Sequence, residues 1–343
     1  MTDPHPLKNC KREKSDVGRM CSALTNQLLL RDYRHVFPQS MYHIPTEFSE
    51  DAEAAYQLTS LTDLFIVLNQ TNKALMLIGD SISRQSIEAL QCILSIEKKT
   101  EMVTIDPPVT KILWGATKYV ITLSNANTSH QPVTVSILYF AVWSQYGNGA
   151  GDMYRKEAKR LLKRNPTTDI FFIFNIGMHE KYEVTQHKHV VDILTSAKKV
   201  LLGMKNRSNV VLYRESSAQH YNSTAGYYNV KQSEKWNRGK RSLPTCVPYE
   251  TVQNDNNDWR YLGEHHAFRS VNFDTKDVIP FRDISRHYFD MHSSSPFFKS
   301  AQYKRGPDRD CTHFSVQGAP ILYRLLWYQI LKRALLSSNN NNS

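Results

Sequence analysis

Residues 74–94 read ALMLIGDSISRQSIEALQCIL, and this stretch decides the predicted fold. The apolar run at 74–78 predicts a buried strand, because the strands of a parallel sheet are covered on both faces. Gly79 permits a tight turn, and a helical pattern of apolar residues starts at Ile82. Ser81 therefore falls where a strand ends and a helix begins.

A serine at such a junction fits two roles. Open α/β sheets bind ligands at the carboxyl ends of their strands, and the unpaired N–H groups of a helix start can receive an oxyanion. Alternatively, Asp80 or Ser81 only caps the helix, since both residue types are favoured caps. The Gly-Asp-Ser triplet alone favours the cap, so the choice depends on the rest of the chain.

Further strands and helices are predicted along the chain. A polar turn joins an antiparallel pair of strands at 118–123 and 133–143. The later elements are buried strands at 169–174 and 209–213, an amphipathic helix at 184–204, a candidate strand at 278–284 and a closing helix at 319–336. This alternation predicts an α/β fold with a central, mainly parallel sheet that is covered on both faces.

We predict one large domain at 56–336. An irregular segment at 1–55 precedes it and packs on it, and a low-complexity, disordered tail at 337–343 follows it. Within the domain, residues 214–274 are polar and aromatic without periodicity, which predicts an irregular insertion. A long excursion of this kind in a compact domain is usually functional.

Composition limits the possible partners. The formal charge is +11, from 43 Lys+Arg against 32 Asp+Glu, but the basic residues are scattered and accompany no nucleic-acid-binding motif. We therefore expect no nucleic acid partner. No apolar run is long enough to span a membrane, and no targeting segment is evident.

Cysteines and sequons bear on the compartment. The five cysteines show no CxxC spacing, so we expect no metal site, and in an oxidising compartment they predict two disulfides and one free thiol. Glycosylation sequons occur at Asn69, Asn127, Asn206 and Asn222. The sequons favour the lumen of the secretory pathway, or secretion, over the cytosol.

A catalytic serine needs a base that takes its proton and a third group that orients the base. Among the 13 histidines, His313 follows Asp310 by three residues, and on a turn or helix start this spacing places both on one face. Asp310 can then accept a hydrogen bond from one imidazole nitrogen and leave the other for Ser81. The alternative is that Asp310 caps the last helix and His313 is incidental.

An oxyanion also needs hydrogen-bond donors. Backbone N–H groups near Ser81 are one source. Asn175 follows the strand 169–174 and lies on the sheet edge where Ser81 is expected, so its side-chain amide is a second candidate. The alternative is an asparagine that only terminates a strand.

Three signals occur in the order of the SGNH/GDSL hydrolase superfamily: GDS after the first strand, Asn-x-Gly after a middle strand and DxxH before the last helix. Within it, the chain resembles the PC-esterase family, which includes the plant trichome birefringence-like proteins and the luminal domain of the sialate O-acetyltransferases. The resemblance covers about residues 60–330, through GDSISRQSIEALQCIL (79–94), FNIGMHE (174–180), YRESSAQHY (213–221), VIPFRDISRHYFDMH (278–292) and DCTHF (310–314).

The resemblance implies an SGNH-hydrolase-like three-layer sandwich in which Ser81 is the nucleophile, His313 the general base and Asp310 its orienting partner. The other implied oxyanion-binding or substrate-binding residues are Asp80, Arg84, Asn175, Arg214 and His220. The superfamily adds a glycine donor, for which Gly115 and the loop at 147–151 are candidates.

Two departures from the family pattern are visible. Ser315 replaces the second cysteine of the family's DCxHWC block, so one family disulfide should be absent. The pairs that the resemblance suggests are Cys246 with Cys311, and Cys92 with Cys10 or Cys21. FNIGMHE also lacks the family's tryptophan pair, a change expected to alter the acceptor groove.

The implied activity is serine-dependent acyl-ester chemistry on a carbohydrate without a bound cofactor. We favour an O-acetyltransferase of a glycan or polysaccharide in the Golgi lumen, with an acetyl donor as co-substrate. The alternatives are a glycan O-acetyl esterase with the same triad, in which water replaces the sugar hydroxyl, and a catalytically silent glycan-binding protein.

Overall fold

The computed structural model describes residues 61, 68, 73–97, 102–112, 116–124, 133–141, 159, 163, 169–176, 180, 182–202, 210–223, 246–289, 292, 311–314 and 320–339. The predicted segment at 1–55, the end of the tail at 340–343 and Asp310 lie outside these residues. For the strands at 102–112, 116–124 and 133–141, the backbone alone is described.

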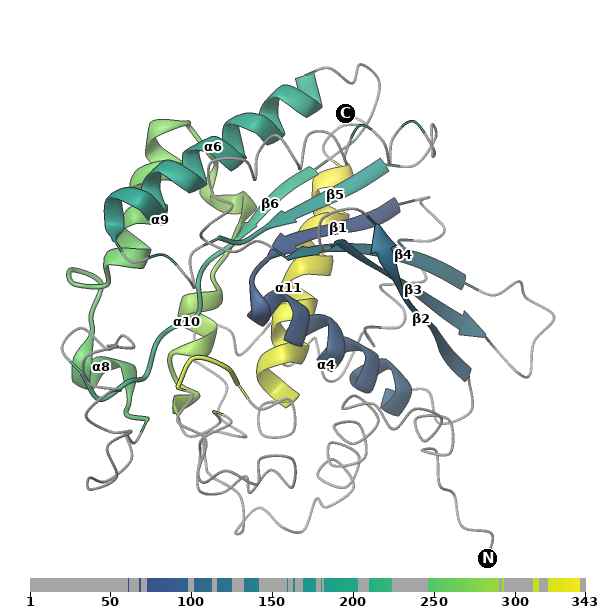
Figure 1. Ribbon diagram of the computed structural model, residues 1–343, viewed down its shortest axis with the longest axis horizontal. Coiled ribbons are helices and arrows are strands. Elements are labelled where there is room, and N and C mark those ends of the chain that lie inside the picture. Colours follow the sequence, from purple (N-terminus) through teal and green to yellow (C-terminus); the bar gives the residue numbers. More distant parts are fainter. Residues whose placement is uncertain are drawn as a thin grey trace, which may run out of the picture.

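The described chain forms an α/β structure around a seven-stranded sheet in the order β2-β3-β4-β1-β5-β6-β7 (Figure 1). The strands are β1 (Lys73–Gly79), β2 (Met102–Ile112), β3 (Ala116–Ser124), β4 (Val133–Ala141), β5 (Asp169–Phe174), β6 (Val210–Arg214) and β7 (Val278–Ile279). Strands β1, β5, β6 and β7 form an all-parallel sheet flanked by helices, and β4 runs parallel to β1 on its other side. The mainly parallel sheet and the antiparallel β3–β4 pair are confirmed, whereas β2 was not predicted.

One face of the sheet packs against α6 (Glu183–Leu202) and α9 (Trp259–Ser270) (Figure 1). Because side chains alternate along a strand, the even-numbered residues of β1 and β5 share this face. The buried cluster contains Met76, Ile78, Ile170, Phe172, Phe174, Val190, Leu194, Ala267 and Phe268. At Gly263, a Cβ would lie 3.0 Å from the Glu183 carbonyl oxygen, so glycine permits the close approach of the two helices.

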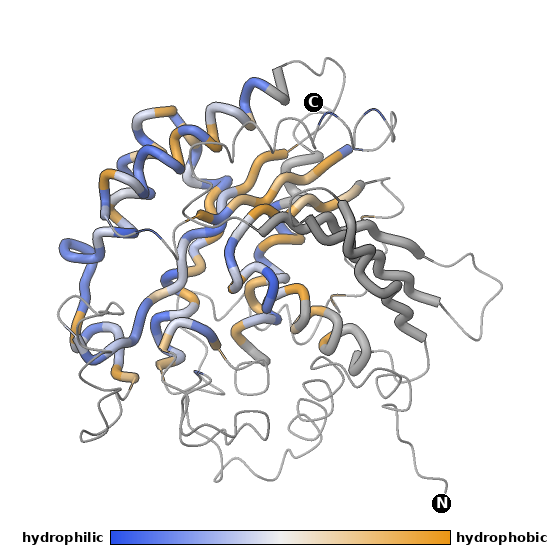
Figure 2. The backbone as a smooth tube through the Cα atoms, viewed as in Figure 1, coloured by the Kyte–Doolittle hydropathy of each residue, from blue (hydrophilic) through white to orange (hydrophobic). Residues whose placement is uncertain are grey.

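The opposite face is covered by α4 (Ser81–Glu97) and α11 (Pro320–Asn339). The Trp327 indole of α11 is fully buried and donates a hydrogen bond to the Ser86 carbonyl of α4 (2.6 Å). Figure 2 shows the resulting pattern, with hydrophobic strands between helices of mixed character. Helices therefore lie on both faces of the sheet, and α11 extends to Asn339, into the segment predicted as a disordered tail.

The predicted irregular insertion at 214–274 is wrong in part, because it contains α8 (Tyr249–Val252) and the twelve-residue α9. The buried residues of α9 are Arg260, Gly263, Glu264, Ala267 and Phe268. Their spacing is helical, but three of the five are not hydrophobic, so a search for apolar periodicity misses the helix.

The predicted strand at 278–284 is also shorter than expected. It ends at Ile279, and α10 (Phe281–Ser285) begins after Pro280. Proline has no N–H to donate to a neighbouring strand but fits the start of a helix. The remaining described helix is the short 3₁₀ turn η8 (Thr275–Asp277).

Candidate active site

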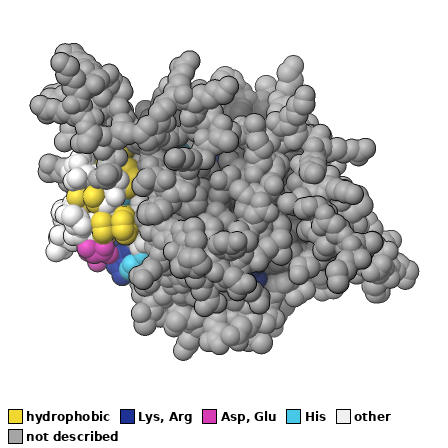
Figure 3. All heavy atoms as spheres, turned by 90° about the horizontal axis from the view of Figure 1, so that it is seen from below, with side chains coloured by type: hydrophobic (Ala, Val, Ile, Leu, Met, Phe, Trp, Pro, Cys, Tyr) yellow, Lys and Arg dark blue, Asp and Glu magenta, His cyan; other side chains and the backbone are white. Residues whose placement is uncertain are grey.

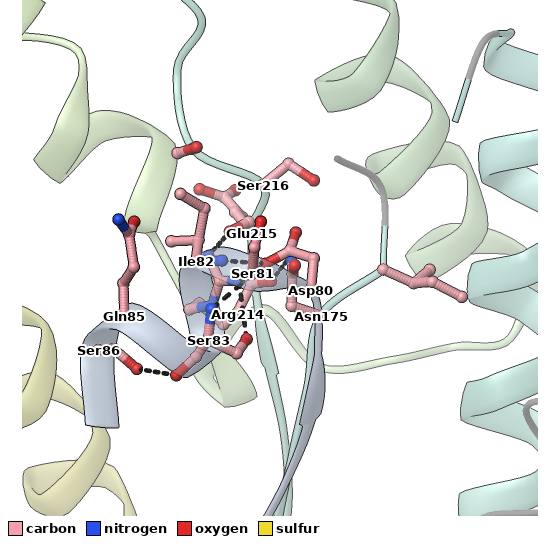
Figure 4. A network of polar contacts seen from close by, with 12 residues as sticks. Asp80, Ser81, Ile82, Ser83, Gln85, Ser86, Asn175, Arg214, Glu215 and Ser216 are labelled. Carbon is pink, nitrogen blue, oxygen red and sulfur yellow. Dashed lines mark hydrogen bonds and ion pairs between the residues drawn. The ribbon is translucent and has the colours of Figure 1, made fainter. Parts of the chain in front are cut away.

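The turn between β1 and α4 places Ser81 at the carboxyl edge of the sheet (Figure 4). Gly79 is required there, because a Cβ would lie 2.1 Å from the Ser83 hydroxyl oxygen. The Asp80 carboxylate accepts hydrogen bonds from the backbone N–H groups of Ile82 (3.0 Å) and Ser83 (3.3 Å). Asp80 is thus the cap of α4, and the Ser81 side chain is left for another role.

The Ser81 hydroxyl contacts the His313 ring. Ser81 Oγ lies 2.5 Å from His313 Nε2, although 232 positions separate the two residues. With an unprotonated Nε2, the hydroxyl donates the hydrogen bond and the imidazole is placed to take its proton. Both side chains are half-buried, so a small reactant can reach them.

Several contacts hold the His313 segment in place. A disulfide joins Cys311 to Cys246, as the family resemblance suggested. Phe314 forms an antiparallel bridge with His292, and the His292 ring contacts the His313 carbonyl at 3.0 Å. The position of the candidate base is therefore fixed from the segments around residues 246 and 292.

Arg214 lies beneath the Ser81 turn and points toward Asp80 and Ser83 (Figure 4). Its side chain is 2% exposed, and Nη2 donates to Asp80 Oδ1 (3.2 Å) and to the Ser83 hydroxyl (3.0 Å). The guanidinium also lies 5.0 Å from the centre of the Phe281 ring, a distance at which cation–π attraction is effective. Arg214 thus ties the end of β6 to the cap of α4.

We expect Arg214→Met to lower the free energy of unfolding by about 3–5 kcal/mol, because it removes the cationic partner of a buried carboxylate. Urea unfolding measures this loss. Arg269→Met is the matched control, since Arg269 is exposed and donates to a carbonyl of its own helix. A loss for Arg214→Met no larger than that of the control would show that this buried contact does not stabilise the turn.

Asn175 is fully buried beside this turn. Its backbone N–H donates to the Ile78 carbonyl (2.7 Å), and its side-chain amide donates one hydrogen bond to the Arg214 carbonyl (2.9 Å). An amide has two N–H donors, so one remains for an oxyanion. Within the described residues, the backbone N–H of Ser81 also makes no hydrogen bond.

The other predicted site residues lie in different places. Arg84 is exposed on the first turn of α4, three residues beyond Ser81. His220 is fully buried behind the His313 segment and does not line an open site. Asp310, Gly115 and the loop at 147–151 lie outside the described residues, so their roles stay predictions.

A second buried polar cluster fixes the loop that follows β6. The Glu264 carboxyl group of α9 accepts hydrogen bonds from Tyr213 OH (2.9 Å), Ser216 Oγ (2.7 Å) and Gln186 Nε2 (3.0 Å). Burial, and next the charge of Glu215, raises the pKa of Glu264 to about 8. This cluster joins α6, β6 and α9 at the edge of the sheet that carries Ser81.

The raised pKa of Glu264 predicts a pH-dependent stability. Because the folded-state pKa of about 8 exceeds the ordinary 4.5, the folded protein binds a proton that the unfolded chain releases between these values. The free energy of unfolding should therefore fall as the pH rises from about 4.5 to about 8. Glu264→Gln should flatten this slope in urea unfolding, and Glu183→Gln, at a more exposed carboxylate, should not. Equal slopes for wild type and Glu264→Gln would contradict the prediction.

The sequence interpretation missed Ser83, His292 and Glu264. Ser83 lies in the quoted GDSISR stretch, and His292 ends the block VIPFRDISRHYFDMH, so the resemblance contained a signal for both. Glu264 lies in no motif, and only the tertiary structure reveals its contacts.

Comparisons with known proteins give no relative: no family model, no curated protein and no solved structure matches this chain.

Proposed function

We propose that the protein carries out serine-dependent acyl transfer, with Ser81 as the nucleophile and His313 as the general base. The observation that carries this proposal is the 2.5 Å contact between Ser81 Oγ and His313 Nε2 at the carboxyl edge of a parallel sheet. Imidazole takes the proton as the hydroxyl attacks an ester carbonyl, and an acyl-serine forms as the leaving alcohol receives that proton. The acyl group then passes to a second hydroxyl, which restores Ser81.

Two donors support the oxyanion of this reaction. One is the backbone N–H of Ser81, in the first turn of α4. The other is the second amide hydrogen of Asn175, since the first is donated to the Arg214 carbonyl. Donors of this kind stabilise the charge that develops on the carbonyl oxygen. We assign Asp310 as the group that orients His313, on its spacing of three residues.

The proposed fold class is an SGNH-hydrolase-like three-layer sandwich, supported by the parallel strands, the helices on both faces and the order Ser81, Asn175, His313 along the chain. The PC-esterase resemblance adds the substrate class, and we propose an O-acetyltransferase acting on a glycan or polysaccharide. The Cys246–Cys311 disulfide fits an oxidising compartment such as the secretory lumen.

On the face seen in Figure 3, the described side chains visible at the left include hydrophobic, acidic and basic ones next to one another. Charges of both signs therefore occur in this described part of the surface. Among the described residues, no helix has the length and apolar character needed to cross a membrane, and no cluster of His, Cys, Asp and Glu could hold a metal.

The test is incubation with an isotopically labelled acetyl ester, with and without glycan acceptors, followed by mass spectrometry of the products. Labelled O-acetyl glycan that forms with wild type but not with Ser81→Ala is the expected result. Labelled free acetate without glycan product would instead identify an esterase with the same machinery. If no product and no acyl-enzyme form with any donor, the proposal is overturned. A catalytically silent glycan-binding protein is then the remaining alternative.

A further inference from the structure

Two buried histidines stand behind the candidate base. His220 and His292 are both 0% exposed, and His220 Nδ1 lies 2.5 Å from His292 Nε2. The outer nitrogen of each ring faces a backbone carbonyl: His220 Nε2 lies 3.0 Å from the Arg286 oxygen, and His292 Nδ1 lies 3.0 Å from the His313 oxygen. The pair therefore links the turn after α10 to the backbone of the catalytic histidine.

Counting protons shows that two neutral rings do not satisfy these contacts. A carbonyl oxygen only accepts, so His220 Nε2 and His292 Nδ1 must each carry a hydrogen. A neutral imidazole has one N–H, which would leave two lone pairs facing each other across 2.5 Å. One additional proton between the rings turns this repulsion into a charge-assisted hydrogen bond.

The surroundings indicate which ring holds the additional proton. Burial, and next the neighbouring His292, lowers the pKa of His220 well below its ordinary value, so His220 stays neutral. The Phe314 ring stacks on His292 with centroids 4.3 Å apart, whereas the Phe314 and His220 rings are nearly perpendicular and their centroids lie 6.1 Å apart. The face of an aromatic ring attracts a cation, which favours the charge on His292.

Among the described residues, the charged groups near the pair include Arg286 and His287 on the turn after α10, with carboxylates of α8 and α10 beyond them. Arg286 donates to His287 Nε2 (3.1 Å) and has carboxylate oxygens of Glu250 and Asp283 at 3.9 Å each. His287 accepts this bond through an unprotonated Nε2, and protonation of His287 would lower the pKa of His220 further. Asp290 and Asp310 lie outside the described residues.

We infer that His292 is held as a buried imidazolium, which donates through Nδ1 to the His313 carbonyl and through Nε2 to neutral His220. His292 is then a positioning residue for the base of the proposed acyl transfer, and this consequence rests on the proposed function. Its positive charge disfavours protonation of His313. With His292 charged, His313 therefore stays unprotonated, and able to act as a base, down to a lower pH than it would beside a neutral His292.

The protonation state is tested in the wild-type protein by NMR of ¹³C,¹⁵N-labelled protein, with each histidine ring assigned through bond correlations to its own assigned backbone. The expected result at neutral pH is a proton on both nitrogens of His292 and on Nε2 alone of His220. A neutral His292 would overturn the inference. This measurement needs no substrate, so its failure is distinct from a failure of the proposed function.

The consequence for activity is tested by the pH profile of turnover of an activated acetyl ester. His292→Asn keeps a donor near the position of Nδ1 but removes the charge, so the acid limb should move up by about one pH unit, as expected for loss of a close like charge. His220→Asn keeps an acceptor near Nδ1 and should leave the profile in place, whereas His220→Leu should shift it as His292→Asn does.

The control is His187→Asn, on the exposed side of α6. Its profile should match that of the wild type. An unshifted acid limb in a folded His292→Asn variant would show that His292 acts through packing alone. If that variant does not fold, the NMR measurement on the wild type still decides the protonation state.

Discussion

Replacing Ser81 with Ala is expected to reduce turnover of an activated acetyl ester by roughly 10⁴- to 10⁶-fold, the loss typical of removing the nucleophile of a triad. The variant removes one hydroxyl and leaves the Asp80 cap of α4 and the Arg214 contacts in place. The fold should therefore persist, and thermal unfolding serves to check it. Labelling by a fluorophosphonate, which reacts with activated serines, should disappear together with the turnover.

The matched control is Ser270→Ala. Ser270 is exposed at the end of α9, and its hydroxyl donates to the Ala267 carbonyl of the same helix. This variant should keep full turnover and labelling. Fluorophosphonate labelling that persists in a folded Ser81→Ala protein would remove Ser81 from the proposed role.

The second large effect is expected for His313→Gln. Glutamine can hydrogen-bond to Ser81 but cannot take its proton at neutral pH, so turnover should fall about as far as in Ser81→Ala. Since the two residues act as one unit, the double variant should be no slower than either single variant. The measurement is kcat/KM for the four proteins of this cycle.

Two outcomes would contradict this prediction. If His313→Gln retains most of the turnover, the 2.5 Å contact has no catalytic role and another group serves as the base. If the double variant loses the product of the two single losses, Ser81 and His313 act independently. Both outcomes would require a different account of the site.

The sequence predicted those parts of the fold that depend on local apolar pattern. Strand β5 was predicted at its observed bounds, and the residues of β1 and α4 follow a pattern that needs no tertiary information. Helix α9 was missed because its packed face includes Arg260 and Glu264, whose burial depends on partners elsewhere in the chain. Polar residues that become buried through tertiary contacts leave no signal in a hydrophobicity pattern.

The candidate site was likewise predicted only in part. Ser81 and His313 were predicted from motifs, and the structure brings them together. Arg214 and His220 were expected to line the site. Arg214 is instead buried against Asp80, and His220 is buried against His292. A motif indicates that a residue lies near the candidate active site. Its distance from the reacting atoms depends on tertiary packing, to which residues along the whole chain contribute.

The acyl-enzyme itself tests the central claim most directly. The protein is mixed with an activated acetyl ester, quenched in acid within the first turnover and digested, and the acetylated peptide is sequenced by mass spectrometry. We predict an acetyl group on Ser81 in the wild type and none on that peptide in His313→Gln. Turnover without acetylation of Ser81, or an acetyl group that accumulates on a different residue, would contradict the account.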